Sequence, residues 1–444
     1  MKVKIKKKNN SFLFATFLWI YIITNTTLYI KNYAPHYLIE GMSLLGMFFV
    51  FFFSGKLFYK WKLHKIIILY VLGVLCFLIP DILSGNKTGL SMGINLFLPI
   101  IILFFLISVM EKQTELKYLI HIPIVYGFII SLQSLILGAL IYFGVNVGGH
   151  YETIEKNGGA SRFVYDYFLG LQSTIFNLGK HKLPRLNSYY LEPAKFAFFL
   201  IIPFVITLFK YKETKKKPYL FVSLICVACL FLTFSRAGYV SCIIAFGIFA
   251  ILKKFVQENK KATFNDLVLI LIGLILLVGI VFGIFIVINY LIENGNSNNW
   301  LLKQFTFSEN GKVVLVRSES SNFSGIIQRL SDRPIGYGMT VLLHNGGQYD
   351  YNVANALSFW LYGSGYIGTL IIVTIIIKLT VTYAIPCIKS KNYLKNAFGV
   401  IYLAQTIFSF SYGTWMNIDY IFTIGIMIVL CTKENIKYEN IDCC

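Results

Sequence analysis

KLPRLNSYYLEPAKFA, residues 182–197, is the stretch in which a polar loop runs into an apolar helix. Arg185 places a permanent cation in the loop, and Glu192-Pro193 opens the helix that follows. Proline suits a first helical turn because its missing N–H would be unpaired there anyway. A carboxylate just before it faces the positive end of the helix dipole. The stretch therefore predicts a cation and an anion close together where a membrane span begins, although a helix cap beside a lipid-facing arginine explains the same residues.

The composition around this stretch is typical of a membrane protein. Of the 444 residues, 57% are hydrophobic and 14% are charged, which is more apolar than a soluble core requires. About twelve apolar runs of spanning length predict an all-α, polytopic membrane protein that forms a single integral domain over residues 1–444. The predicted spans are residues 11–30, 37–57, 65–82, 92–110, 118–145, 193–209, 219–234, 238–252, 267–292, 367–385, 397–410 and 418–431.

The lysine-bearing loops predict how the chain is oriented. Five short basic loops are expected on the cytoplasmic side, together with both termini; they are residues 56–65, 111–117, 210–217, 253–261 and 389–395. Two large polar loops, residues 146–192 and 293–355, then lie outside, as does the tight turn at 235–237. Because the net charge of +20 follows this membrane pattern, nucleic acid is not expected as a partner.

The cysteines predict neither disulfide bonds nor a metal site. The eight cysteines lie mostly inside apolar runs, and the predicted outer loops hold almost none. We therefore expect no metal and no cofactor.

The six arginines are distributed differently from the lysines. All six lie on the outer side in the predicted topology, namely Arg162, Arg185, Arg236, Arg317, Arg329 and Arg333. The positive-inside bias cannot explain this, because it acts in the opposite direction. A guanidinium is a planar fork that grips phosphate or carboxylate through two parallel hydrogen bonds. The pattern predicts an outer site for an anionic ligand such as a diphosphate, with some of these arginines pairing with nearby carboxylates instead.

Three motifs occur in order along the chain. The first is R-L-N-S-Y-Y-L-E-P-A at residues 185–194, the second is L-T-F-S-R-A-G at 232–238, and the third is R-P-I-G-Y-G-M at 333–339. Together they resemble the O-antigen polymerase and O-antigen ligase superfamily, which are bacterial membrane glycosyltransferases of the GT-C kind. The resemblance covers about residues 185–368 and also fits the layout of spans and outer loops. It matches Arg185, Glu192 and Arg236 to family positions, and Gly336 and Gly338 to a G-x-G element.

The resemblance implies an enzyme of the bacterial inner membrane. Its substrate would be an oligosaccharide repeat linked to undecaprenyl diphosphate on the outer leaflet. Polymerases join such repeats into O-antigen or capsule polysaccharide, whereas ligases move the glycan to another acceptor. The ligase pattern has a His-Asn pair at the position of Asn355, but here the preceding residue is Ala354, and His344-Asn345 stands ten residues earlier. This departure favours a polymerase.

The expected reaction assigns roles to individual residues. Arg185 and Arg236 would stabilise the departing diphosphate, and Glu192 and His344 are the candidate bases; we group these four as catalytic. The predicted substrate-binding residues are Arg333, Arg317, Arg162, Tyr190 and Tyr337. A helix cap explains Glu192 equally well, a solvated loop explains His344, and interfacial anchoring explains the tyrosines. The expected partners are the lipid-linked glycan, the lipid bilayer and, as a further candidate, a chain-length regulator protein.

A lipid-linked oligosaccharide flippase or another transporter is the competing class. Transporters keep charged or broken-helix sites near the middle of the bilayer, often in repeated halves. No convincing internal repeat is visible here, and the polar residues concentrate in the two outer loops. This distribution favours surface chemistry over transport.

Overall fold

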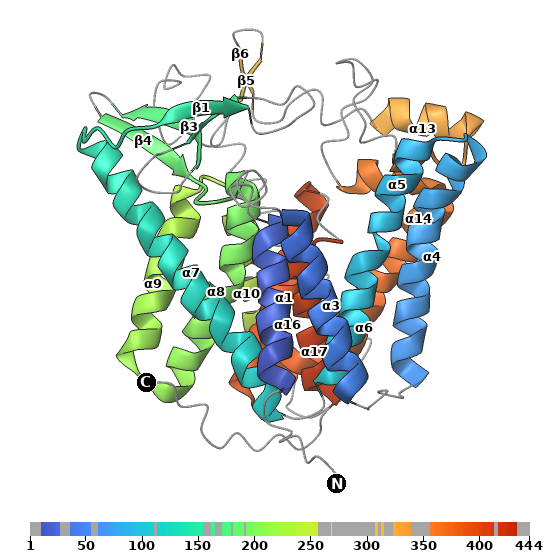
Figure 1. Cartoon of the computed structure of the whole chain (residues 1–444), viewed down its shortest axis with the longest axis horizontal. Coiled ribbons are helices and arrows are strands. Elements are labelled where there is room, and N and C mark those ends of the chain that lie inside the picture. Colours follow the sequence, from blue (N-terminus) through green and yellow to red (C-terminus); the bar gives the residue numbers. More distant parts are fainter. Residues whose placement is uncertain are drawn as a thin grey trace.

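The computed structural model describes most of the chain. The described residues are 10–26, 36–54, 61–110, 113–153, 161–164, 171–178, 181–190, 192–255, 268, 307–309, 312–314, 323–339, 356–412 and 416–432. Within them the fold is a bundle of long helices with a small sheet at one end (Figure 1).

Apolar helices form the body of the protein, as the hydropathy predicts. In the described residues, seven helical segments are long and apolar enough to cross a membrane, and three shorter helices are also apolar. Among the described residues, the helices before the sheet are α1 (Asn10–Thr26), α3 (His36–Ser54), α4 (Trp61–Leu83), α5 (Lys87–Asn95), α6 (Phe97–Val109) and α7 (Gln113–Tyr142). They are followed by α8 (Pro193–Thr214), α9 (Lys217–Leu232) and α10 (Arg236–Phe255). The last are α14 (Ala356–Leu379), a π-helical turn (Thr380–Ala384), α15 (Ile385–Lys389), α16 (Tyr393–Tyr412) and α17 (Ile418–Thr432).

Two of the predicted spans are broken helices. The span expected at 92–110 is made of α5 and α6, which meet at Leu96. The span expected at 367–385 begins earlier, because α14 already starts at Ala356 and is interrupted at Gly365, where φ is 66° and ψ is −167°. The span expected at 267–292 lies outside the described residues except for residue 268, so the count of twelve stays a prediction.

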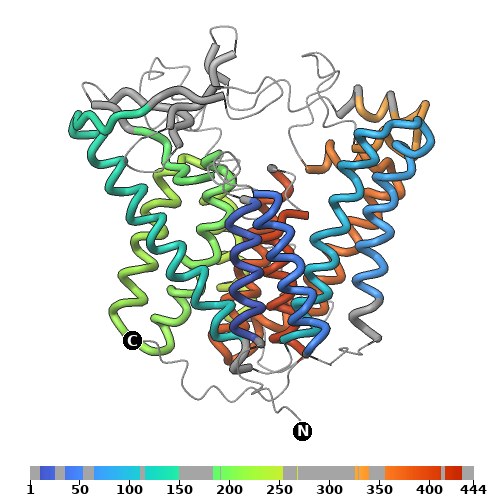
Figure 2. The backbone as a smooth tube through the Cα atoms, viewed as in Figure 1, coloured from blue at the N-terminus to red at the C-terminus, as the bar shows by residue number. Residues whose placement is uncertain are grey.

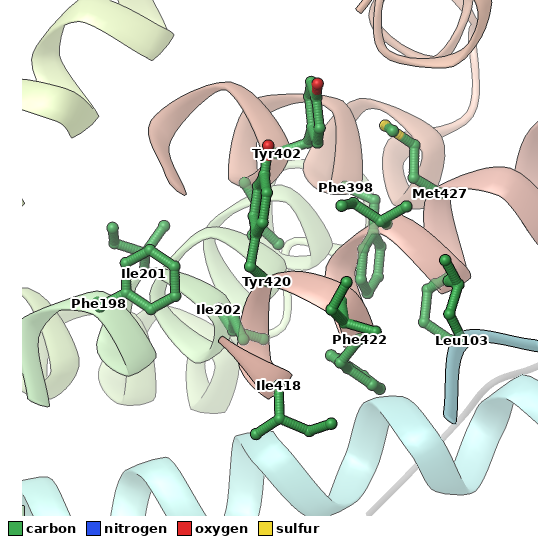
Figure 3. Packing of buried hydrophobic residues seen from close by; sticks show 14 of the residues in the cluster. Leu103, Phe198, Ile201, Ile202, Phe398, Tyr402, Ile418, Tyr420, Phe422 and Met427 are labelled. Atoms are coloured by element: carbon green, nitrogen blue, oxygen red, sulfur yellow. The ribbon is translucent and has the colours of Figure 1, made fainter. Parts of the chain in front are cut away.

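The core is centred on α8, α16 and α17. A helix that is apolar on all sides belongs in the interior, and residues Phe196 to Ile202 of α8 are fully buried. Figure 3 shows Phe198 of α8, Tyr402 of α16 and Tyr420 of α17 in one buried cluster, and the ring of Phe198 packs on Phe408 of α16 with centroids 5.1 Å apart. The rings of Tyr402 and Tyr420 stack with centroids 5.8 Å apart. These contacts hold the start of α8 rigidly, and the first sequence motif leads directly into it.

Several helices instead turn aromatic side chains outward. On α3, Phe48, Phe49, Phe52 and Phe53 are 45–71% exposed. A face of this kind would promote aggregation in water, but lipid tails cover it in a bilayer. The exposed rings therefore agree with a multi-pass membrane protein.

The first large loop contains a sheet, which the sequence patterns do not predict. The strands β1 (His150–Thr153), β2 (Ser161–Val164), β3 (Leu171–Leu178) and β4 (His181–Leu186) pair in chain order as an antiparallel sheet. Their short polar sequences carry no hydropathy signal as strong as that of the spans. Consequently the bundle is all-α, as expected, but the first large loop is not a plain loop.

The second large loop also has regular structure. Strands β5 (Phe307–Glu309) and β6 (Lys312–Val314) form a hairpin, and α13 (Phe323–Asp332) is a short helix. Helix α13 buries Ile326 and Leu330 against Tyr362 of α14. The loop is thereby anchored on the membrane bundle.

The polar elements gather at one end of the bundle, which we call the sheet-bearing end. The sheet, α13 and the turn between α9 and α10 lie there, whereas the lysine-rich connection between α8 and α9 lies at the opposite end (Figure 1). The backbone trace shows α7 on one side and α6 with α5 on the other slanting away from each other toward the sheet-bearing end (Figure 2). This arrangement agrees with the predicted separation of the two kinds of loop.

Candidate functional site

Arg185 connects the first two sequence motifs. It lies in β4, and its side chain is half-buried. Its Nε donates to the carbonyl of Thr233 at 3.1 Å, and its Nη2 donates to the carbonyl of Phe234 at 3.3 Å. The planar fork thus holds two successive carbonyls at the end of α9, a geometry that suits arginine better than lysine. Because these carbonyls belong to the turn before Arg236, Arg185 positions that turn.

The turn between α9 and α10, which Arg185 binds, leads directly into a second arginine. Phe234 has φ of 49°, a conformation that tightens the reversal, and the Ser235 carbonyl accepts from the N–H groups of Gly238 and Tyr239. Arg236 is the first residue of α10. A cation at the positive end of a helix dipole is unfavourable. The N-terminus of α10 therefore favours a bound anion, which the Arg236 guanidinium and the helix terminus would hold together.

Two further polar side chains, Tyr239 and Glu192, interact electrostatically with Arg185. The hydroxyl of Tyr239 lies within electrostatic range of both Arg185 and Arg236. Burial lowers the pKa of Arg185, while the negative charges of Tyr239 and Glu192 in their ionised forms would raise it. We call Arg185, Glu192, Arg236 and Tyr239 the arginine cluster.

Glu192 is not an ordinary helix cap. It occupies the N-cap position of α8, with φ of −133° and ψ of 140°, but its side chain makes no capping hydrogen bond. Its Oε2 atom is buried without a hydrogen-bond partner in the described part of the protein. An orphaned buried carboxylate oxygen is energetically costly. This carboxylate is therefore available for a ligand proton or hydroxyl.

Tyr190 belongs to the core, which corrects its predicted role in binding a ligand. Its side chain is 1% exposed, and its ring stacks on Phe196 and Phe199 with centroids 5.4 and 5.8 Å away. A ring packed in this way has no free face for a sugar. Its neighbour Tyr189 donates instead to Gln133 of α7 at 2.7 Å. Both tyrosines fasten the first motif to the bundle.

The third motif forms a separate structure, which we call the RPIGYGM loop (Arg333–Met339). Arg333 donates from Nη2 to the carbonyl of Pro80 in α4 at 3.0 Å, and its guanidinium lies 5.4 Å from the ring centroid of Tyr337. Tyr337 in turn stacks on Tyr362 of α14 at 4.7 Å. Arg333 and Tyr337 therefore already have partners within the protein.

The single outer cluster of arginines expected from the sequence does not form. Helix α13, which Arg333 directly follows, lies on the opposite side of the sheet-bearing end from β4 (Figure 1). Arg185 binds the turn that leads into Arg236, whereas Arg333 is held against α4. The prediction that Arg333 lies with Arg185 and Arg236 is thus wrong, because each guanidinium lies against the carbonyl to which it donates.

Three predicted site residues lie wholly or in part outside what the structure describes. Arg317 and His344 lie outside the described residues. Arg162 lies in β2, opposite Glu152 of β1 in the antiparallel register, and its side chain is not described. In the part of the chain that the structure does describe, no three His, Cys, Asp or Glu side chains gather as metal ligands would.

Tyr239, Asp81 and Asp419 are further candidate residues that the sequence motifs do not single out. Tyr239 follows Arg236 by three residues, so helical spacing alone puts both on one face. Asp81 and Asp419 are 0% and 1% exposed, and each has one carboxylate oxygen without a hydrogen-bond partner among the described residues. An acid inside an apolar run is the signal that could have found both.

Comparison with known proteins identifies no relative: no family model, no curated protein and no solved structure matches the chain.

Proposed function

We propose that this chain is a bacterial polysaccharide polymerase with a GT-C-like architecture. It joins undecaprenyl-diphosphate-linked oligosaccharide repeats on the outer leaflet of the inner membrane into O-antigen or capsule polysaccharide. Both termini and the lysine-bearing end would face the cytoplasm, and the sheet-bearing end would face outward. The observation that carries the proposal is the arginine cluster, in which Arg185 binds the turn that presents Arg236.

The cluster suits a diphosphate leaving group. A hydroxyl of one lipid-linked repeat attacks the anomeric carbon of another, and the bond from that carbon to the diphosphate oxygen breaks. The oxygen leaves with the electron pair, so negative charge grows on undecaprenyl diphosphate. Two guanidinium groups and the α10 N-terminus already in place would stabilise this charge, which is often the largest contribution to catalysis. Glu192 would accept the proton of the attacking hydroxyl.

One observation bears on the transporter alternative. Helix α14 is interrupted at Gly365, and broken helices are common in transporters. Here, however, the backbone of the RPIGYGM loop fills the interruption, since Tyr366 N donates to the Pro334 carbonyl at 3.2 Å. The break is therefore occupied by the chain itself, which favours a structural role for it.

The direct test uses the purified protein in lipid vesicles with undecaprenyl-diphosphate-linked repeats. We expect longer lipid-linked glycans and one released undecaprenyl diphosphate for each bond formed, with the same rate in EDTA, because arginines would do the work of a divalent cation. Transfer to a non-repeat acceptor alone would favour the ligase. Movement of unextended substrate across the vesicle, without polymer, would favour the transporter and overturn the proposal.

The role of Glu192 gives a second prediction. Glu192→Gln is expected to lower the rate of polymer formation by about 100-fold, because the amide cannot accept a proton. Since the side chain makes no capping bond, the melting temperature in detergent should stay unchanged. Asp332→Asn, an exposed carboxylate at the same end, is the matched control and should retain full activity. A Glu192→Gln protein with normal activity would exclude Glu192 as the base.

A further inference from the structure

The RPIGYGM loop is attached at both of its ends to two consecutive residues of α4. At its start, Arg333 Nη2 donates to the Pro80 carbonyl at 3.0 Å. At its end, the Met339 N–H donates to Oδ2 of Asp81 at 2.7 Å. Between them, Tyr337 N donates to the Tyr362 carbonyl of α14 at 2.8 Å. The loop is thus joined to α4 and α14 at once.

Asp81 is enclosed on all sides at this point. Its side chain is 0% exposed. A methyl group at Gly89 of α5 or at Gly338 of the loop would overlap its carboxylate, so both glycines leave it room. No side-chain cation lies against it among the contacts described, and Oδ1 has no hydrogen-bond partner there. Burying a carboxylate in this way is more costly than burying a neutral amide of the same shape.

We propose that Asp81 is a positioning residue that holds the RPIGYGM loop, and with it Tyr337 and the outer part of α14, in the arrangement needed for polymer formation. The inference rests on the proposed function for its activity readout, while the hydrogen bond to Met339 stands independently of it. Asp81 acts through the loop backbone and is not itself in contact with the substrate. What it supplies is one acceptor oxygen, which an asparagine can replace.

The test separates this hydrogen bond from packing. Asp81→Asn keeps an acceptor for Met339, whereas Asp81→Ala removes it and leaves a cavity. In Asp81→Ala/Gly89→Ala the added methyl group occupies part of the vacated space without restoring the acceptor. We expect the double variant to recover the melting temperature that Asp81→Ala loses, while the loop stays unfastened. Asp332→Ala, which removes an exposed carboxylate beside the loop, is the control.

The readout is amide hydrogen exchange of the 333–339 peptide in the full-length protein, together with the rate of polymer formation. We expect exchange at least about tenfold faster in Asp81→Ala and in the double variant than in the wild type and in Asp81→Asn. Polymer formation should fall about tenfold in the same two variants. Slow exchange in Asp81→Ala would overturn the proposed attachment. Fast exchange with normal polymer, or activity restored in the double variant, would overturn the positioning role.

A wild-type protein that forms no polymer would count against the proposed function rather than against Asp81. In that case the exchange data would still decide whether Asp81 holds the loop.

Discussion

Replacing Arg185 with lysine is expected to lower the rate of polymer formation by about 100-fold, the size of effect seen when one preplaced donor is lost from a charge-stabilising site. The reason is geometric. Arg185 reaches the Thr233 and Phe234 carbonyls through two different nitrogens. A lysine ammonium is a single point charge at the end of a flexible stem and cannot reproduce that fork. The turn that presents Arg236 would lose its support, and the cluster would lose one of its two guanidinium groups.

Arg333→Lys is the matched control for this substitution. Arg333 makes one hydrogen bond to the Pro80 carbonyl and lies over the ring of Tyr337. A lysine can make both contacts, because an ammonium also donates to carbonyls and also binds aromatic faces. We expect less than about a threefold change in rate, corresponding to the small worth of a solvent-accessible contact of this kind.

Both variants should be measured in the same vesicles with saturating lipid-linked substrate, after their melting temperatures have been compared. Equal activities of Arg185→Lys and the wild type would remove Arg185 from the site. Equal losses in Arg185→Lys and Arg333→Lys would indicate that the two arginines share one role, contrary to their separate positions.

Gly365→Ala is expected to have the largest effect on folding. At φ of 66° and ψ of −167°, Gly365 adopts a conformation that is essentially restricted to glycine. A Cβ at this position would overlap the Pro334 carbonyl oxygen and lie 2.8 Å from the Gly336 nitrogen, both of them backbone atoms that cannot swing aside. We expect a loss of more than about 3 kcal/mol in the free energy of unfolding, from backbone strain combined with overpacking.

Gly85→Ala is the matched control for the conformational part of that loss. Gly85 has the same φ of 66°, but nothing lies within 4 Å of the position that its Cβ would take. Its replacement should cost only about 1–2 kcal/mol, the penalty for a left-handed residue. The measurement is the free energy of unfolding of both variants in the same detergent, with heat or a chemical denaturant used to unfold them. If the two losses are equal, the close packing between the RPIGYGM loop and α14 does not contribute to stability.

Hydropathy and proline placement determined much of the membrane bundle in advance. Long apolar runs have to form helices inside a bilayer, because no water is present to satisfy the backbone. For this reason the span predicted from residue 193 agrees with α8, which begins at Pro193. The sheet of the first large loop could not be found in the same way, since the short strands β1 to β4 are held by pairing between strands rather than by burial of an apolar run.

The structure separates residues that the sequence prediction groups in one site. Tyr189 and Tyr190 are neighbours in a polar stretch, yet the ring of Tyr190 is in the core. Arg333 has the same chemistry as Arg185, yet a carbonyl of α4 holds it elsewhere. A sequence shows which side chains can bind an anion. Whether a carbonyl or a ring of the protein binds the same side chain instead depends on how distant helices pack.

The amino-acid sequence by itself determined the membrane class, the helical bundle and the separation of lysine-bearing from arginine-bearing segments, because each depends on local composition alone. Only the tertiary structure decided that Arg185 supports the turn before Arg236 and that Asp81 holds the RPIGYGM loop. Both contacts join residues that are far apart in the chain. Contacts of that kind depend on how helices pack against one another, which no single stretch of sequence contains.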